Sequence, residues 1–177
     1  MTTFLELAKK RFSVRSFRPD AIEDEKLDAI LEAAHVAPTA ANKQPQRVLV
    51  AQGAEALGKI AKAAKTFSAP LVLLVCADRD KAWVRKHDGK NVMEVDASII
   101  TDHMMLCAAD LGLGSYWISN FDPSVIKNEF LLPPNWEPVN ILAVGYANCE
   151  SASPDRYGET RLPLRETVFF ETLQQSK

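Results

Sequence analysis

The chain has 177 residues, of which 47% are hydrophobic and 25% charged, and its formal net charge is −2. This composition fits one soluble globular domain, and the near-zero net charge argues against a nucleic acid or an anionic membrane as partner. No uninterrupted apolar run approaches the roughly 18 residues that are needed to span a bilayer. The first residues lack the apolar stretch of a secretory signal, so none is expected.

Three cysteines, Cys76, Cys107 and Cys149, lie far apart in apolar runs, and none belongs to a Cys-x-x-Cys pair. Thiols in such positions are expected to be buried and reduced, which points to a reducing compartment, the cytoplasm. The pattern gives no support for a cysteine nucleophile.

The hydrophobic periodicity predicts alternating helices and strands. Helices are expected over residues 3–10, 23–36, 54–65, 94–111 and about 122–130, and strands over 47–51, 71–77 and 139–146, with a short strand that runs into a loop over 114–121. The run 71–77 is rich in branched residues, which is typical of a strand buried on both faces. The helix 94–111 is apolar almost all the way round, so it is either a central core helix or one that a partner subunit covers.

Short local signals predict where two helices end or begin. Gly112 is expected to end the longest helix, and Asp122 is expected to cap the next one, with Pro123 at its first position. The polar residues 79–93 are expected to form a mobile or lid-like excursion, and residues 148–160 a connector. The apolar run 168–170 must dock on another surface, because it would otherwise be exposed to water.

The N-terminal end is cationic although the whole chain is slightly acidic. Residues 1–19 carry five basic side chains and one acidic side chain, Glu6. Among them, Arg11, Ser13 and Arg15 combine guanidinium groups with a hydroxyl, and this set suits a phosphate because each guanidinium can donate two hydrogen bonds to one oxyanion. The alternative is an ordinary solvated helix end with surface arginines.

A second stretch of interest is the loop 38–46, in which Pro38 and Pro45 enclose small residues, a hydroxyl and amides. Small residues let a flat ligand approach the backbone closely, and the amides of Asn42 and Gln44 can bond to its edge. An ordinary proline-bounded turn is the alternative.

Two other kinds of site are not predicted. Gly112-x-Gly114 lacks the third glycine of a dinucleotide-binding loop and follows a helix instead of a strand. His35, His87 and His103 lack the paired spacing of metal ligands, so no metal site is expected.

Four motifs resemble the signatures of the nitroreductase-like FMN-dependent flavoproteins and keep the order found in that family. They are Arg11-x-Ser13-x-Arg15-x-Phe17, the loop 37–45, Leu111–Gly114 followed by Trp117-Ile118, and Arg161-x-Pro163-Leu164. The resemblance therefore runs nearly from one end of the chain to the other.

The resemblance implies an α+β fold with a mixed, mostly antiparallel central sheet flanked by helices, built from residues 1–177 as a single domain. It also implies a homodimer with two FMN sites at its interface. A C-terminal arm, about residues 148–177, would cross to the partner subunit. Such an exchange would account for the apolar tail and for the helix 94–111.

The resemblance also implies roles for individual residues. Arg11 and Ser13 would bind the FMN phosphate, joined by Arg161 from the far end of the chain, and Phe12 between them would also belong to the cofactor site. Two guanidinium groups match a phosphate monoester, whose charge approaches about −2. Arg15 would reach toward the ribityl chain or the pyrimidine edge, where a positive charge favours the reduced flavin.

The flavin ring would have two neighbours by the same resemblance. Pro38, Thr39 and Ala40 would pack on it from the partner subunit, with Asn42 and Gln44 supplying amides. A backbone N–H of Ser119 or Asn120, which follow Trp117 and Ile118, would contact flavin N5. The alternative for Trp117 and Ile118 is that they are only core strand residues.

One stretch departs from the family pattern. Many relatives carry an asparagine and a lysine before the strand that corresponds to 71–77, whereas residues 64–68 contain no asparagine. Lys62 and Lys65 are possible substitutes, so the contact to the pyrimidine edge is left open.

The resemblance implies an oxidoreductase that takes hydride from NADH or NADPH onto FMN and passes two electrons to a nitroaromatic, quinone or related acceptor. Donor and acceptor would share one slot, which predicts ping-pong kinetics, and no side chain would act as a catalyst. Two alternatives remain: a flavin-binding protein with a sensing, storage or flavin-remodelling role, and a reductive dehalogenase.

Overall fold

The computed structural model describes residues 3–173, so residues 1–2 and the last four of the expected arm, 174–177, lie outside the described part. The elements run in the order α1 (Phe4–Lys10), α2 (Asp24–Val36), η1 (Ala40–Asn42), β1 (Gln46–Ala51), α3 (Ala54–Ala61), β2 (Leu71–Asp78), α4 (Met93–Asp110), β3 (Gly114–Ile118), α5 (Pro123–Glu129), β4 (Trp136–Gly145), α6 (Tyr157–Thr160) and α7 (Leu164–Thr167). No helix among the described residues is both long enough and apolar enough to cross a membrane.

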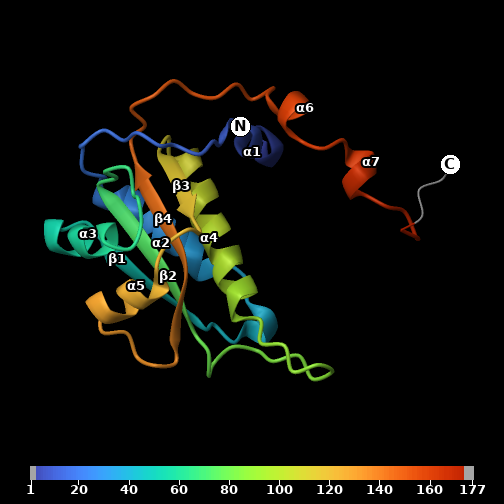
Figure 1. Cartoon of the computed structure of the whole chain (residues 1–177). Helices are drawn as coiled ribbons and strands as arrows, with labels where there is room; N and C mark the ends of the chain where they lie inside the picture. Colours follow the sequence, from blue (N-terminus) through green and yellow to red (C-terminus); the bar gives the residue numbers. More distant parts are fainter. Residues whose placement is uncertain (1–2, 174–177) are drawn as a thin grey trace.

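Helices cover both faces of a central sheet (Figure 1). Within the described residues the sheet has four strands in the order β1-β2-β4-β3, and all neighbouring strands are antiparallel. One parallel bridge, between Ser13 and Ser115, adds the segment after α1 to the edge of β3. The predicted α+β fold with a mixed, mostly antiparallel sheet is therefore confirmed.

The alternation of side chains along β2 creates two separate cores, because successive residues of a strand point to opposite faces. Leu71, Leu73 and Val75 belong to the core shared with α2 and α4. Val72 and Leu74 belong to the core on the other face, beneath α3 and α5. Every residue of β2 is buried, as the sequence predicted.

Local signals correctly predicted the ends of two helices. Gly112 takes a φ of +77°, a left-handed conformation that glycine adopts without steric cost, and directly follows α4. The side chain of Asp122 accepts hydrogen bonds from the backbone N–H groups of Ser124 and Val125, and Pro123 begins α5. These two caps fix the ends of β3, because β3 and its loop join α4 to α5.

Two boundaries differ from the sequence prediction. The helix expected over 54–65 ends at Ala61, whereas the short strand expected from Gly114 ends at Ile118 and runs into a loop as predicted. The strand expected over 139–146 begins earlier, at Trp136, and passes through Pro138. Proline is tolerated there because the pairing of β2 with β4 is irregular between Val75 and Cys76, opposite this position.

The long helix α4 is buried along one face and partly covered on most of the remainder. Its buried side chains include those of Ala97, Ile100 and Met104. The exposed residues of the helix are Glu94, Val95 and Asp110. Both expected alternatives, a central core helix and a helix that a partner completes, therefore stay open.

The excursion between β2 and α4 is a narrow, twisted hairpin closed by a bridge between Val84 and Asn91 (Figure 1). Its turn contains Gly89 in a left-handed conformation and an ion pair between Arg85 and Asp88.

The C-terminal segment has two parts, and this refines the expected arm of residues 148–177. Residues 148–161 lie against their own chain, where Arg156 and Tyr157 bond to backbone carbonyls around α1. From Leu162 onward the chain projects away from the body and carries α7 (Figure 1). Only this second part is placed to reach another molecule.

Candidate functional site

The segment after α1 is held in an extended course beside β3. The backbone N–H of Val14 donates to the carbonyl of Ser115 at 2.9 Å, and the side chain of Val14 is fully buried. Alternation along an extended chain then places Arg11, Ser13 and Arg15 on the opposite, outward side. The spacing of the cationic motif is thus explained by the local backbone geometry.

This close approach depends on Gly114. A Cβ atom at Gly114 would lie 2.6 Å from Cγ2 of Val14, closer than real Cβ atoms come to any neighbour. The absence of a side chain at Gly114 therefore lets the cationic segment pack directly on β3.

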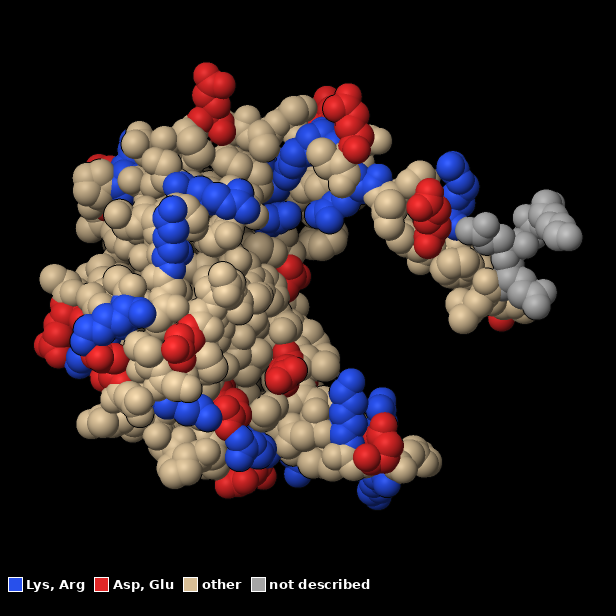
Figure 2. All heavy atoms as spheres, in the orientation of Figure 1, with Lys and Arg blue, Asp and Glu red and all other residues tan. Residues whose placement is uncertain are grey.

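Arginines from both ends of the chain line one hollow of about 400 Å³. Its lining includes all the residues that were predicted for the phosphate, together with Arg15; the full set is Arg11, Phe12, Ser13, Arg15, Ala152, Arg156, Tyr157, Thr160 and Arg161. Figure 2 shows Lys and Arg side chains gathered where α1 and α6 meet. Four guanidinium groups around one small hollow form a site for a compact anion of more than one charge.

Arg156 and Tyr157 are part of this hollow, although the sequence prediction placed them in a connector. The guanidinium of Arg156 donates to the carbonyls of Lys9 at 3.0 Å and Arg11 at 2.6 Å. It also donates to the hydroxyl of Tyr157 at 2.6 Å. Arg156 thus ties α6 to the end of α1 and brings Arg161 to the hollow.

Arg15 leads away from this hollow along β3. Its guanidinium lies 4.7 Å from the ring centroid of Tyr116, which in turn packs edge-on against Phe67 at 5.1 Å.

Lys65 lies over the other aromatic ring of this stack, 4.9 Å from the centroid of Phe67. Lys62, by contrast, forms an ion pair with Glu129 at 2.7 Å. Of the two lysines that could replace the missing asparagine, Lys65 is therefore the one near Arg15.

The residues expected near flavin N5 lie at the far end of β3. The indole N–H of Trp117 donates to the Oδ1 atom of Asn140 at 2.9 Å, and Ile118 is buried. Ser119 and Asn120 follow in an exposed loop. Trp117 and Ile118 are thus strand residues in the core, and the backbone beyond them is accessible.

The loop 38–44 does not meet the arginines within one chain. The backbone N–H of Ala40 donates to Asp96, in the first turn of α4, whereas Arg11 and Phe12 share a hollow with Ala109 near its end. At 1.5 Å per residue these two positions are about 20 Å apart along the helix. Pro38, Asn42 and Gln44 are exposed, and Thr39 and Ala40 are half buried. The predicted site residues therefore form two groups at the two ends of α4.

A larger hollow of about 800 Å³ separates the projecting C-terminal part from α1 and α4. Its lining is mainly apolar and includes Phe4, Leu5, Met105, Leu106 and Leu164. Figure 2 shows the molecule hollowed beneath this arm. The hollow adjoins the arginine cluster, because Arg11 and Arg161 line both.

Metal binding and thiol nucleophiles have little support in the described part of the chain. Residues 3–173 contain no group of three or more His, Cys, Asp or Glu side chains that could hold a metal ion. Burial raises the pKa of the Cys76 thiol to about 12 and also raises that of Cys107. Both thiols are therefore protonated, and poor nucleophiles, at neutral pH.

Comparison with known proteins decides the family. A model described as the nitroreductase family matches residues 8–67 and 61–146. The chain belongs to the nitroreductase family. The family predicted from the four sequence motifs is confirmed, and the matched range includes both the cationic segment and the loop 38–44.

Similar proteins share almost the whole chain with this nitroreductase-family member. A crystal structure of a nitroreductase family protein from Clostridium difficile 630 is 50% identical, covers 97% of this chain and 100% of its own, and superposes with a TM-score of 0.96. The FMN reductase [NAD(P)H] of Bacillus subtilis is 30% identical over 88% of this chain and 70% of its own length. A protein of Thermus thermophilus named NADH dehydrogenase is 27% identical over 92% of this chain and 93% of its own length.

Proposed function

We propose that this protein is an NAD(P)H-dependent FMN oxidoreductase that reduces nitroaromatic, quinone or related electron-poor acceptors. The observation that carries the proposal is the single hollow shared by Arg11, Ser13, Arg15 and Arg161. It has the charge and the hydroxyl that an FMN phosphate requires, and it lies at one end of β3. The names of the relatives from Bacillus subtilis and Thermus thermophilus support both the cofactor and the donor.

The residues present offer groups suited to each part of FMN. Arg11, Ser13 and Arg161 would hold the phosphate, and Arg15 would lie along the ribityl chain toward the pyrimidine edge, with Lys65 as a second cation there. A backbone N–H of Ser119 or Asn120 would face N5.

When bound, FMN would supply the two-electron chemistry that links NADH or NADPH to the acceptor. The chain's own residues would bind and orient the reactants, and none is assigned an acid–base or covalent role. One slot shared by donor and acceptor predicts ping-pong kinetics.

We further propose that a second copy of the chain completes each site. Within one chain the loop 38–44 and the arginine hollow lie at opposite ends of α4, and in this proposal the loop that contacts the flavin ring belongs to the other subunit. The arm offers a reason for that subunit to bind, because Phe170 is 87% exposed and Leu164 is 77% exposed. Several large apolar side chains exposed to water on one short segment mark a contact surface.

Free thiols are consistent with the expected location. Cys76, Cys107 and Cys149 are free thiols, which supports the proposed location in a reducing compartment, the cytoplasm. Of the three, only Cys76 is fully buried; Cys149 is exposed, so the expectation of a buried thiol is wrong there, because this residue lies in the connector after β4 and not in a core strand.

Steady-state kinetics of FMN-loaded protein test the proposed function. NADH and NADPH would each be offered with a quinone and with a nitroaromatic compound. We expect turnover with at least one pair and parallel lines in double-reciprocal plots. FMN-loaded protein that oxidises neither donor would contradict the proposal and favour a sensing or storage role.

The alternative functions have their own readouts. Consumption of the flavin itself would indicate flavin remodelling, and release of halide from a halogenated substrate would indicate dehalogenation.

A further inference from the structure

The loop 38–45 has an unfavourable backbone that needs external support. Ala41, Asn42 and Gln44 adopt positive φ values of 49°, 52° and 50°, in the left-handed region that residues with side chains rarely occupy. Such conformations persist only where surrounding contacts over-determine them. The contacts that fix this loop therefore decide the shape of the surface that it offers to the flavin ring.

The beginning of the loop is anchored on α4 and on itself. The N–H of Ala40 donates to Oδ1 of Asp96 at 2.9 Å, and Asp96 is almost completely buried. The hydroxyl of Thr39 accepts the N–H of Gln44 at 3.1 Å, which closes the loop.

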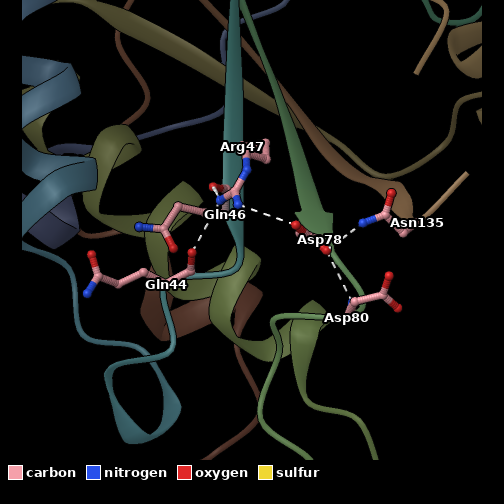
Figure 3. A network of polar contacts seen from close by, with 6 residues as sticks. All are labelled: Gln44, Gln46, Arg47, Asp78, Asp80 and Asn135. Atoms are coloured by element: carbon pink, nitrogen blue, oxygen red, sulfur yellow. Dashed lines mark hydrogen bonds and ion pairs between the residues drawn. The ribbon is translucent and has the colours of Figure 1, made fainter. Parts of the chain in front are cut away.

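The end of the loop is anchored by a backbone bond and by a guanidinium group: the N–H of Asp78 donates to the carbonyl of Pro45 at 2.8 Å, and Arg47 bonds to the residues on either side. Arg47 donates through Nη1 to the carbonyl of Gln44 at 3.3 Å and to that of Gln46 at 2.6 Å. Its Nη2 atom lies 3.3 Å from Oδ2 of Asp78. Figure 3 shows Arg47 between the loop carbonyl and Asp78.

Asp78 is itself held firmly. Its side chain is 6% exposed, and its Oδ1 atom accepts from the amide of Asn135 at 2.8 Å and from the N–H of Asp80 at 3.2 Å. In Figure 3, Asn135 reaches Asp78 from the side opposite to Arg47. A buried carboxylate with its lone pairs directed in this way fixes the guanidinium in one orientation.

We propose that Arg47 and Asp78 are a positioning pair that holds the loop 38–45 in the conformation needed at the flavin ring. This inference rests on the proposed function for its consequence, but the anchoring itself is a property of the chain alone. Arg47 and Asp78 touch neither substrate nor cofactor in this account. They act through the carbonyl of Gln44 and so determine where the loop's small residues and amides lie.

The test compares two variants with a matched control. R47K keeps the positive charge but loses the planar fork that serves two carbonyls and a carboxylate together. D78N removes the charge that orients the fork. R79Q is the control, because Arg79 forms an ion pair with Glu137 at the same end of the sheet and its side chain bonds to no residue of the loop.

Amide hydrogen exchange in flavin-free protein is the first measurement. We expect the amides of residues 40–44 to exchange at least about 10-fold faster in R47K and in D78N, with no change in R79Q or at Leu49 and Ala51, whose N–H groups face β2 in the ladder. Unchanged exchange at residues 40–44 in either variant would contradict the inference that Arg47 and Asp78 hold the loop. An equal increase in R79Q, or throughout β1, would also overturn it, because the effect would then be general opening of the sheet edge. If R47K does not fold, D78N alone decides.

The second measurement uses FMN-loaded protein. We expect the FMN dissociation constant of R47K to stay within about 3-fold of the parent value, while hydride transfer from NAD(P)H in a single turnover slows by about 10-fold. An unchanged transfer rate would contradict the functional part of the inference. If the parent protein itself transfers no hydride, the proposed function fails, and the exchange experiment still decides the anchoring.

Discussion

Arg11 and Arg161, which lie near opposite ends of the sequence, line the same small hollow together with Ser13. Arg156 brings them together by bonding to the carbonyls of Lys9 and Arg11. The chain thus brings together, at one hollow, residues that the sequence separates, and we propose that this hollow is the cradle that binds the FMN phosphate.

The first prediction concerns this cradle. R11A and R161A should each weaken FMN binding by about 10-fold or more, because a hydrogen bond to a charged group contributes about 1.5–3 kcal/mol, and the double variant should be purified largely flavin-free. Quenching of flavin fluorescence measures the dissociation constant. R18A is the control, since Arg18 pairs with Asp20 outside the hollow. Full flavin occupancy in the double variant would refute the phosphate assignment.

The second prediction concerns the close packing of the cationic segment on β3. G114A should destabilise the fold by about 1–3 kcal/mol and weaken FMN binding as well, because the new methyl group forces Val14 and its neighbours away. G58A, in the middle of α3 with nothing within 4 Å of the added Cβ, should be neutral or stabilising by about 0.5–1 kcal/mol. Denaturant unfolding compares the two. Equal stability of both variants would show that the segment can shift freely.

The third prediction concerns the projecting arm. The double variant L164S/F170S should dissociate the dimer at concentrations where the parent chain stays associated, because the arm would lose its apolar contacts with the partner. L131S is the control, since Leu131 is 86% exposed but lies outside the arm. Analytical ultracentrifugation gives the mass of each. A dimer equally stable in all three proteins would exclude the arm from the interface.

The fourth prediction follows from the raised thiol pKa values. At pH 8 the exposed Cys149 should be alkylated rapidly, whereas Cys76, with a pKa raised to about 12 by burial, should react only after unfolding. The neutral thiol is the unreactive form, so the rate at Cys76 should stay low until the pH approaches that value. Mass spectrometry after timed labelling distinguishes the sites. Rapid labelling of Cys76 in folded protein would contradict its position in the core.

Much of the fold was predictable because its signals are local. The apolar run of β2, the left-handed Gly112 and the Asp122–Pro123 cap each act within a few residues of their own position. The cationic motif was also visible, because alternation along an extended segment needs no tertiary information.

Other features depend on contacts between distant parts of the chain and could not be predicted locally. Arg156 belongs to the site only because it meets the carbonyls around α1. The start of β4 was missed because Pro138 normally argues against a strand, and only the irregular pairing with β2 makes room for it. The bonds that hold residues 148–161 against α1 likewise depend on distant parts of the chain.

The central claim is that each FMN lies between two chains, one providing the arginines and the other the loop 38–44. Mixing two inactive variants tests it most directly: R11A/R161A, which lacks the cradle, and A40W, which blocks the loop. After dissociation and reassociation, each mixed dimer should contain one intact site, so flavin binding and NAD(P)H oxidation should return although neither variant shows them alone. If the mixture stays inactive while mixed dimers are present by mass spectrometry, the cradle and the loop of one chain serve the same site, and the account is wrong.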